Sequence, residues 1–155
     1  MLEIITHPNN ILRQKARKLE RSEIKSAKIQ KLINEMIETM NKKQGLGLAA
    51  PQINQSLQII IVQKNNETVV FINPKILKKS WRKDVLEEGC LSVPEVYCEV
   101  KRAKKIKIQA LDRNGEVTKF NAKGLFARII QHEIEHLDGI LIIDKQGKCE
   151  KPPKL

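Results

Sequence analysis

The sequence predicts an α+β fold in which antiparallel strands pack around a C-terminal helix that carries an HExxH motif. Three observations support this class. Apolar residues recur at helical spacing between residues 29 and 40, alternating apolar runs between residues 57 and 120 indicate strands, and helical spacing returns from residue 121 to residue 137. Because strands and helices occupy separate blocks of the chain, an α+β arrangement fits better than an alternating α/β one.

Length and composition predict one domain over residues 1–155. A chain of 155 residues can bury a core of its own, and 41% of its residues are hydrophobic while only 3% are aromatic. The core should therefore be built from Ile, Leu and Val. The sequence shows no repeat and no linker-like segment, and we expect residues from about 146 to 155, which end in CEKPPKL, to form a short loose tail.

The first helix is predicted from a stripe of apolar residues at steps of three and one. It ends before Gly45, which is a plausible stop. The stripe consists of Ile29, Leu32, Ile33, Met36, Ile37 and Met40.

Two β-hairpins are predicted in the middle of the chain. Residues 57–63 and 68–73 are rich in β-branched residues and flank the turn-forming Asn65 and Asn66. Residues 106–111 and 117–120 alternate in the same way around the sequence DRNG. The following segment, 121–137, predicts a helix with Gly139 as its C-terminal stop.

No membrane segment or export signal is predicted. The longest apolar runs, 59–62 and 140–143, are far shorter than the roughly 18 to 20 residues of a membrane span. The N-terminus has an early Glu3 and lacks the basic and apolar regions of a signal peptide. We therefore expect a cytoplasmic protein with no membrane partner.

The three cysteines are predicted to be reduced thiols. Cys90, Cys98 and Cys149 cannot all pair with one another, and their spacing matches no disulfide framework or CxxC zinc cluster. One of them could then serve as a thiolate ligand of a metal ion.

A formal net charge of +11 would attract polyanions at low salt. The basic runs 78–83 and 101–107 are scattered and alternate with apolar residues. This pattern favours a solvated lysine-rich surface, with a functional polyanion contact as the alternative.

The HExxH motif predicts a metal site. His132 and His136 lie four residues apart on one face of the predicted helix, so both imidazoles can reach one cation, while Glu133 points toward a water beside it. By residue frequencies the motif arises by chance in roughly one such chain in two hundred. The alternative is a structural pair of histidines.

A third ligand is expected upstream of the helix. A catalytic metal site usually has three protein ligands, and the acids after His136, namely Asp138, Asp144 and Glu150, are unconvincing candidates. Cys90 in the sequence EEGCLS would complete the set, because the adjacent Gly89 allows close backbone approach. Taken alone, Cys90 is better interpreted as a small buried apolar residue, and only its context favours a ligand.

The motifs GLGLAAPQ, EGCLS and HEIEH resemble, in this order, the three motifs of the peptide deformylases. The resemblance extends to HPNNILRQKA, to NPKI at residues 73–76 and to QHEIEHLDGIL, so it covers nearly the entire chain. It implies removal of the formyl group from the N-terminal formylmethionine of newly synthesised polypeptides, with release of formate. The partners would be formylmethionyl nascent peptides and the ribosome surface, without specific DNA, in the cytoplasm or an organelle with formylating translation.

The resemblance also implies roles for individual residues. The cofactor would be one divalent metal ion, with Fe²⁺ expected and Zn²⁺, Ni²⁺ or Co²⁺ as replacements. Leu91 and Ile129 are candidates for the apolar methionine pocket, and Glu88 and Arg102 could pair to support the Cys90 segment or could form surface salt bridges. The site residues are Cys90, His132 and His136 as metal ligands, Glu133 as proton carrier, Gln52 and the Leu91 backbone N–H as oxyanion donors, and Gly45, Gly47 and Gly89 as substrate-binding positions.

Two departures from the family pattern are visible. Glu135 stands where deformylases usually have Asp, so its support of the site is in doubt. Many bacterial members also continue into a C-terminal helix linked to ribosome contact, and this chain stops soon after Lys151. Two rival functions are a zincin-type metallopeptidase, which would not need Cys90, and a basic ribosome- or RNA-binding homologue without catalysis.

Overall fold

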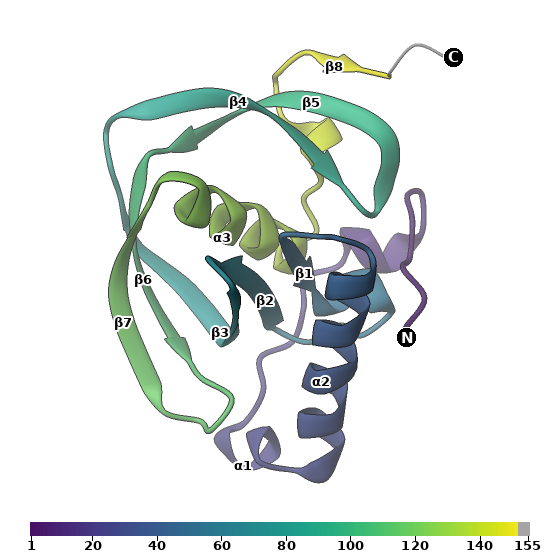
Figure 1. The fold of residues 1–155 in the computed structure, drawn as a ribbon, viewed down its shortest axis with the longest axis vertical. Coiled ribbons are helices and arrows are strands. Elements are labelled where there is room, and N and C mark those ends of the chain that lie inside the picture. The colour runs from purple at the N-terminus through teal and green to yellow at the C-terminus, as the bar shows by residue number, and fades with distance from the viewer. Residues whose placement is uncertain (152–155) are drawn as a thin grey trace.

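The computed structural model describes residues 1–151 and combines two antiparallel sheets with one central helix (Figure 1). Among these residues, the first sheet has the strand order β1-β2-β3-β6-β7 and the second has the order β4-β5-β8. The strands are β1 (Gly47–Ala49), β2 (Ile59–Lys64), β3 (Glu67–Lys79), β4 (Lys83–Cys90), β5 (Val93–Ala103), β6 (Lys105–Leu111), β7 (Val117–Lys123) and β8 (Cys149–Glu150). The helices are α1 (Arg21–Ile24), α2 (Ala27–Lys42) and α3 (Gly124–Leu137), with 3₁₀ turns η1 (Asn10–Arg13), η2 (Ala50–Ile53) and η3 (Ile142–Asp144).

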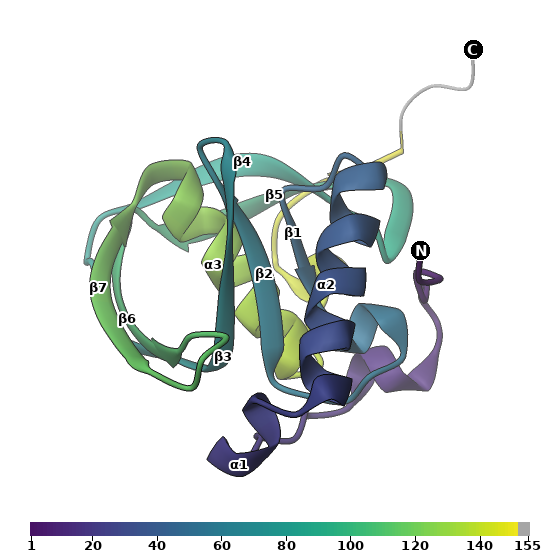
Figure 2. The same ribbon diagram turned by 60° about the horizontal axis from the view of Figure 1, so that its bottom comes forward.

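Strand β2 is buried on both of its faces. Ile60 and Val62 pack in the same apolar cluster as Ile130 of α3, whereas Ile59 and Ile61 pack in a second cluster with the apolar stripe of α2. Figure 2 shows α2 and α3 on opposite sides of β2. The unbroken run of four aliphatic residues is explained by this position, because a strand covered on both sides needs no polar face.

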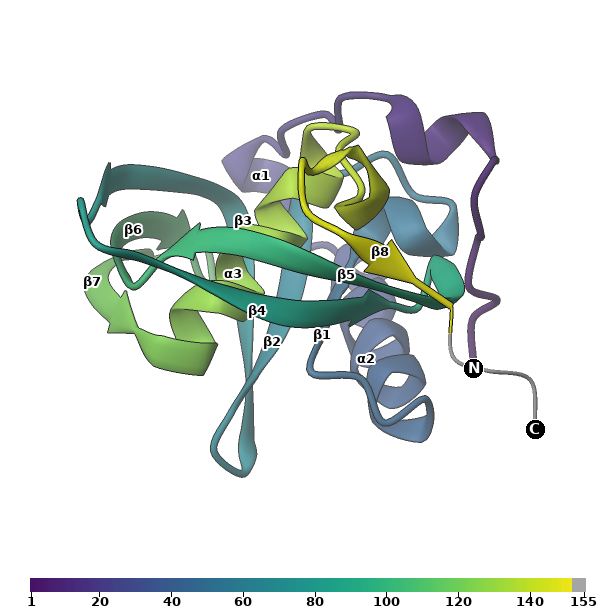
Figure 3. The ribbon, with the colours of Figure 1, turned by 90° about the horizontal axis from the view of Figure 1, so that it is seen from above.

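Helix α3 lies between the two sheets. Seen from above, β4 and β5 cross over it, while the first sheet curves around its other side (Figure 3). Ala127, Ile130 and Leu137 of α3 are buried against the first sheet. The predicted class, antiparallel strands around a central C-terminal helix, is confirmed, and the helix that carries the HExxH motif is held from both sides.

The N-terminal helix and the first hairpin are confirmed, but β3 continues six residues past its predicted end at residue 73, to Lys79. Helix α2 begins at Ala27, where the Ser26 side chain accepts a hydrogen bond from the Ile29 N–H and so caps the helix. It ends at Lys42, and Gln44 rather than Gly45 adopts a left-handed conformation after it. In the hairpin, β2 and β3 turn at Asn65, whose φ is +54°.

The second hairpin is confirmed, but the predicted start of the last helix is wrong. Strand β7 continues to Lys123, because Asn121 pairs with Lys107 and Lys123 pairs with Lys105 of β6. Gly124, with φ of +63°, then redirects the chain into α3. The predicted end is confirmed, since α3 stops at Leu137 and Gly139 has φ of +74°.

The sheet that carries Cys90 was not predicted. Strand β4 has no fully buried residue and contains Lys83, Asp84, Glu87 and Glu88, so it lacks the apolar alternation that marks a strand. It forms because its whole length pairs with β5, from Lys83 opposite Ala103 to Gly89 opposite Tyr97. This partner lies nearby in sequence, but the pairing leaves no local apolar signal.

The prediction of three reduced thiols is wrong for two of them. Cys98 and Cys149 form a disulfide across a sequence separation of 51 residues, and Cys90 is free. The pairing of β8 with β5 sets Cys149 directly opposite Cys98, which no sequence spacing reveals. The prediction of a loose tail is likewise wrong for Cys149 and Glu150, and the last four residues of that tail, 152–155, lie outside the described residues.

No helix within residues 1–151 is long and apolar enough to cross a membrane.

Candidate functional site

Cys90, His132 and His136 converge where the end of β4 meets α3. Their ligand atoms all lie within 4.8 Å of one another. The Cys90 Sγ is 3.2 Å from the His136 Nε2, and the two histidine Nε2 atoms are also 3.2 Å apart. Cys90, which lies more than 40 positions before the two histidines, therefore presents its sulfur to the same point as their two nitrogens.

This donor set fits a divalent transition-metal ion. The His132 Nδ1 lies 2.9 Å from a Glu88 carboxylate oxygen, and because an ionised carboxylate only accepts, Nδ1 must carry the hydrogen. Nε2 of His132 is then the atom that faces His136. A thiolate and two imidazole nitrogens are the ligands that zinc, iron and similar cations take in proteins.

The electrostatics of the three residues also favour a cation. Burial lowers the pKa of His136 well below its ordinary value, and the positive charge of His132 lowers it further, so that this imidazole stays neutral. Burial also opposes charge on His132, but hydrogen bonds with Cys90 and Glu88 outweigh it and raise its pKa to about 10. The surroundings of His132 thus stabilise a positive charge. A metal ion would take the place of the proton on its Nε2.

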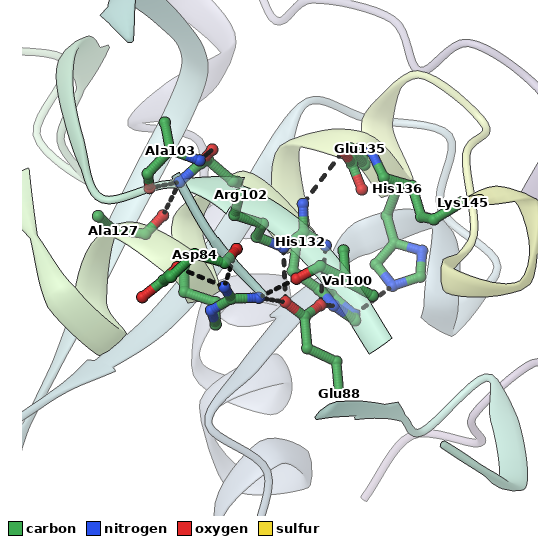
Figure 4. A network of polar contacts seen from close by, with 12 residues as sticks. Asp84, Glu88, Val100, Arg102, Ala103, Ala127, His132, Glu135, His136 and Lys145 are labelled. Carbon is green, nitrogen blue, oxygen red and sulfur yellow. Dashed lines mark hydrogen bonds and ion pairs between the residues drawn. The ribbon is translucent and has the colours of Figure 1, made fainter. Parts of the chain in front are cut away.

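Glu88 joins the metal-site candidates to a buried network of charges (Figure 4). Besides His132, its carboxylate accepts hydrogen bonds from Arg102 at 2.6 and 2.8 Å and from Arg128 at 2.6 Å. Burial alone would raise the pKa of Glu88, but the hydrogen bonds from His132 and Arg102 lower it to about 2. The predicted pairing of Glu88 with Arg102 is confirmed, and the surface alternative is wrong, because Arg102 is only 3% exposed.

The network continues to the C-terminal part of the chain through Glu135. Its carboxylate lies 3.1 Å from the Arg102 guanidinium and 2.6 Å from the Lys145 Nζ beside η3. The longer side chain that replaces the usual Asp therefore still reaches the buried arginine. It also ties α3 to the segment that follows it.

Glu133 is buried beside the three candidate ligands. It is 4% exposed, and its Oε2 has no hydrogen-bond partner among the described residues. Burial raises its pKa to about 7, despite the opposing positive charges of His132 and Arg102. A methyl group added at Gly47 would lie 2.8 Å from the Glu133 Cγ and closer still to Oε1, so glycine at this position leaves room for the carboxylate.

The side-chain amide of Gln52 faces Cys90. Its Oε1 accepts a hydrogen bond from the Ala49 N–H at 2.8 Å, which orients the NH₂ group toward Ser92 Oγ at 3.2 Å and the Cys90 Sγ at 3.7 Å. Gln52 is 2% exposed. An oriented donor thus lies next to the candidate ligand sulfur.

An open cleft of about 450 Å³ gives access to these groups. Its lining combines glycine backbone with apolar side chains, and both candidates for a methionine pocket, Leu91 and Ile129, belong to it. Gly45 faces Leu91, and Gly89 faces the ring of Tyr97, where an added methyl group would lie 2.9 Å from a ring carbon. The lining includes Gly45, Gly47, Gln52, Gly89, Cys90, Leu91, His132 and Glu133.

Sequence analysis missed three residues of the site, namely Asp84, Ser92 and Arg128. Arg128 contacts Glu88 and Asp84, and Ser92 accepts from Gln52. No spacing pattern marks them, because each acts through a partner on another element. Arg128 alone offered a signal, since an arginine on the apolar side of a predicted helix calls for a buried acid.

Comparison with known proteins decides the family. A family model described as polypeptide deformylase matches residues 1–152. The chain belongs to the polypeptide deformylase family. A peptide deformylase of Dictyoglomus turgidum is 46% identical over 146 residues, covering 94% of this chain and 92% of that protein. Another, of Thermodesulfovibrio yellowstonii, is 45% identical over 150 residues and covers 94% and 88%.

Solved deformylase structures share the fold. A class I type b peptide deformylase of Acinetobacter baumannii matches with a TM-score of 0.91 and 37% identity, covering 94% of this chain and 99% of that one. The deformylase of Thermotoga maritima matches with a TM-score of 0.90 and 39% identity, covering 94% and 97%.

Deformylase family membership makes the chain an enzyme. It is a metal-dependent hydrolase that removes the N-terminal formyl group from nascent peptides, and its Cys90, His132 and His136 form a group suited to hold the metal.

Proposed function

We propose that Cys90, His132 and His136 hold one divalent cation, with Fe²⁺ first among the candidates, and that Glu133, Gln52 and Leu91 carry out deformylation around it. One observation carries the proposal: the three ligand atoms lie within 4.8 Å of one another, and two of their residues, Cys90 and His132, line a cleft together with the buried Glu133 and the oriented amide of Gln52. One sulfur and two nitrogens also suit Zn²⁺, Ni²⁺ and Co²⁺, so the choice of Fe²⁺ comes from the family resemblance.

Glu133 is proposed to move the proton in the reaction. When bound, the cation would supply a Lewis acid that polarises the formyl carbonyl and lowers the pKa of water. Glu133 would accept the proton released by water and pass it to the departing amine, a role worth roughly 10² to 10⁴ in rate. A pKa of about 7, raised by burial, suits a group that both accepts and donates a proton near neutrality.

Gln52 and the Leu91 backbone N–H are proposed to stabilise the oxyanion. The formyl oxygen gains negative charge as the carbon becomes tetrahedral, and a donor already in place costs no reorganisation at that moment. The Gln52 NH₂ is held in place by Ala49 and Ser92, as required of such a donor. Leu91 follows Cys90 directly, so its N–H lies beside the candidate ligand.

The substrate is proposed to be an extended formylmethionyl peptide bound along the cleft. Structures of the Acinetobacter baumannii deformylase with actinonin and with Met-Ala-Ser show ligands bound to that relative. In this chain Leu91 and Ile129 would contact the methionine side chain. Gly45, Gly47 and Gly89 line the cleft, and main-chain hydrogen bonds between the cleft and the peptide would give affinity that is indifferent to the peptide sequence.

The proposal is tested by anaerobic purification followed by metal analysis and activity assays on one sample. We expect one divalent ion per chain, rapid formate release from a formyl-Met dipeptide, and no cleavage of an internal-bond peptide. Cys90→Ala should lose both metal and activity, whereas the control Cys149→Ala should keep both. A Cys90→Ala protein with full metal content would refute the ligand set, and cleavage of the internal bond would favour a zincin-type peptidase.

A further inference from the structure

Lysines face one another across the outer surface of β3, β6 and β7. In the strand register Lys78 lies opposite Lys107, and Lys105 lies opposite Lys123. All four are exposed, whereas the alternate residues Ile106 and Ile108 point inward to the core. Like charges directly opposite each other destabilise a sheet, so this arrangement weakens the fold on its own.

These lysines carry no ion-paired acid within residues 1–151, although Glu135 and Asp138 border a depression that Lys75, Lys78 and Lys79 also line. The segments 75–79, 105–109 and 117–123 contain seven lysines and no Asp or Glu. Among the described residues, none of these lysines takes part in an ion pair with an acid, although the other surfaces of the protein hold several such pairs. The lysines of this surface are therefore free of direct ion pairs within the described chain.

The turn between β3 and β4 extends the charged surface and adds an aromatic ring. Trp81 is 93% exposed and lines a depression with Arg82, Lys83, Lys101 and Lys104. Backbone hydrogen bonds join this turn to the next one, from the Ser80 N–H to the Lys105 carbonyl at 2.8 Å and from the Lys104 N–H to the Arg82 carbonyl at 3.1 Å. The turn that carries Trp81 is thus joined directly to the start of β6, where Lys105 borders a shallow depression with Lys78, Lys107 and Lys123.

We propose that this surface, formed by Lys78, Lys105, Lys107, Lys123, Trp81 and Arg82 and here called the lysine face, binds the phosphate backbone of single-stranded RNA. Lysines would neutralise successive phosphates with release of counterions. Trp81 would stack on an unpaired base at the end of the row, which is how proteins hold single strands without reading their sequence. This proposal adopts the alternative interpretation of the basic segments, a functional contact with a polyanion, in place of a solvated lysine-rich surface.

RNA fits the lysine face better than an acidic lipid surface does. Gln109 and Asn121 are exposed on the same strands as the lysines, and their amides can hydrogen bond to phosphate, ribose and bases. A surface that enters a bilayer presents apolar side chains between its basic ones instead. The choice of RNA rather than DNA rests on the family's action on nascent peptides, which are made beside RNA.

The lysine face is separate from the catalytic cleft. None of its six residues lines the cleft that contains Cys90 and Glu133. RNA bound there would leave the cleft open to a peptide. Changes on the face should consequently leave deformylation of a short formyl-Met peptide unchanged, which separates failure of this inference from failure of the proposed catalytic site.

The test compares two triple variants with equal loss of charge. The face variant carries Lys78→Gln, Lys107→Gln and Lys123→Gln, and the control carries Lys18→Gln, Lys25→Gln and Lys28→Gln, which are exposed lysines near α1 and α2. Binding to a labelled single-stranded RNA of about 20 nucleotides is followed by fluorescence anisotropy from 0.05 to 0.3 M salt. Vesicles with phosphatidylserine are assayed in parallel.

We expect the face variant to bind RNA about tenfold or more weakly at 0.1 M salt, with the slope of log affinity against log salt reduced by about 2. The control should change little. Trp81→Ala should lower the affinity about tenfold with a nearly unchanged slope. Because cross-strand repulsion is relieved, the face variant should also melt about 1 to 3 °C higher than the parent chain.

Three results would overturn the inference. They are absence of RNA binding by the parent chain at 0.05 M salt, an equal loss in the face and control variants, and binding to vesicles in preference to RNA. A face variant that misfolded would be detected by its deformylase activity, and Trp81→Ala then supplies the independent measurement, since so exposed a side chain contributes little to folding.

Discussion

The contact between Gly47 and Glu133 is the tightest steric constraint at the candidate site. A methyl group at position 47 would displace the Glu133 side chain. Misplacement of a reacting group by about 1 Å costs roughly a hundredfold in rate. Gly47→Ala should therefore lower kcat/KM by about that factor while metal content stays near one per chain. In the control Gly45→Ala the added carbon would come no closer than 3.2 Å to any neighbour, the nearest being the Leu91 side chain, and an equal loss there would show that the Glu133 contact is not the cause.

Substitution can separate the role of Glu133 in proton transfer from the role of the ligands in metal binding. Glu133→Ala removes a carboxylate that carries a proton in the proposed reaction but does not belong to the ligand group. We expect an unchanged metal content and a rate of formate release that is lower by roughly 10² to 10⁴-fold. Metal analysis and a formate assay on the same preparation check this, and a variant that retained more than a tenth of the activity would remove Glu133 from the mechanism.

Glu88 is the residue on which the buried charges depend. Glu88→Ala would leave Arg102 and Arg128 buried without this carboxylate and would free the ring of His132. Removing one partner of a buried charge pair costs about 3 to 5 kcal/mol, and loss of a carboxylate behind a metal-binding histidine weakens metal binding about 10 to 100-fold. Denaturant unfolding and a competitive chelator titration measure the two effects. Glu88→Gln keeps the size and shape of the side chain and should lose less unfolding free energy than Glu88→Ala. Equal losses in the two variants would show that filling this space contributes nothing to stability.

At the scale of elements, β2 supports α3 and α2 from opposite faces. Ile60 belongs to the cluster that includes α3, and Ile61 belongs to the cluster that includes α2. Both are fully buried, so replacement of either by Ala should cost about 2 to 5 kcal/mol in free energy of unfolding. Only Ile60→Ala should also weaken metal binding, because it loosens the helix that carries His132 and His136. Similar metal affinities for the two variants would show that α3 keeps its position without Ile60.

At the scale of the whole molecule, the disulfide closes a large part of the chain into one loop. Cys98 and Cys149 lie 51 positions apart, and the chain between them includes β6, β7 and α3. Constraining a loop of this size in the unfolded chain stabilises the fold by about 2 to 4 kcal/mol. Cys149→Ser should lower the unfolding free energy by this amount under oxidising conditions and by nearly nothing in the presence of a reducing agent. If the parent chain and Cys149→Ser differed in stability under reducing conditions, the packing of the Cys149 side chain rather than the disulfide would account for the loss.

Local patterns in the sequence determined much of the fold and of the site. Helix α2, both hairpins and the end of α3 follow from apolar periodicity and turn residues, which act between neighbours in the chain. The two histidines and Glu133 were predicted for the same reason, since a helix sets their spacing. Cys90 was a candidate because the predicted metal site lacked a third ligand, whereas Gln52 and Leu91 needed the resemblance to the deformylases, because nothing local relates them to α3.

Only the tertiary structure decided which strands and side chains become partners. The β4–β5 pair, the Cys98–Cys149 disulfide, the contacts of Arg128 and Ser92 and the opposition of lysines on β3, β6 and β7 depend on strand register and on packing around α3. Their residues are polar or isolated in sequence, so they leave no periodic signal. The physical reason is that periodicity reports which face of an element is buried, whereas the partner that buries it is chosen by the fold as a whole.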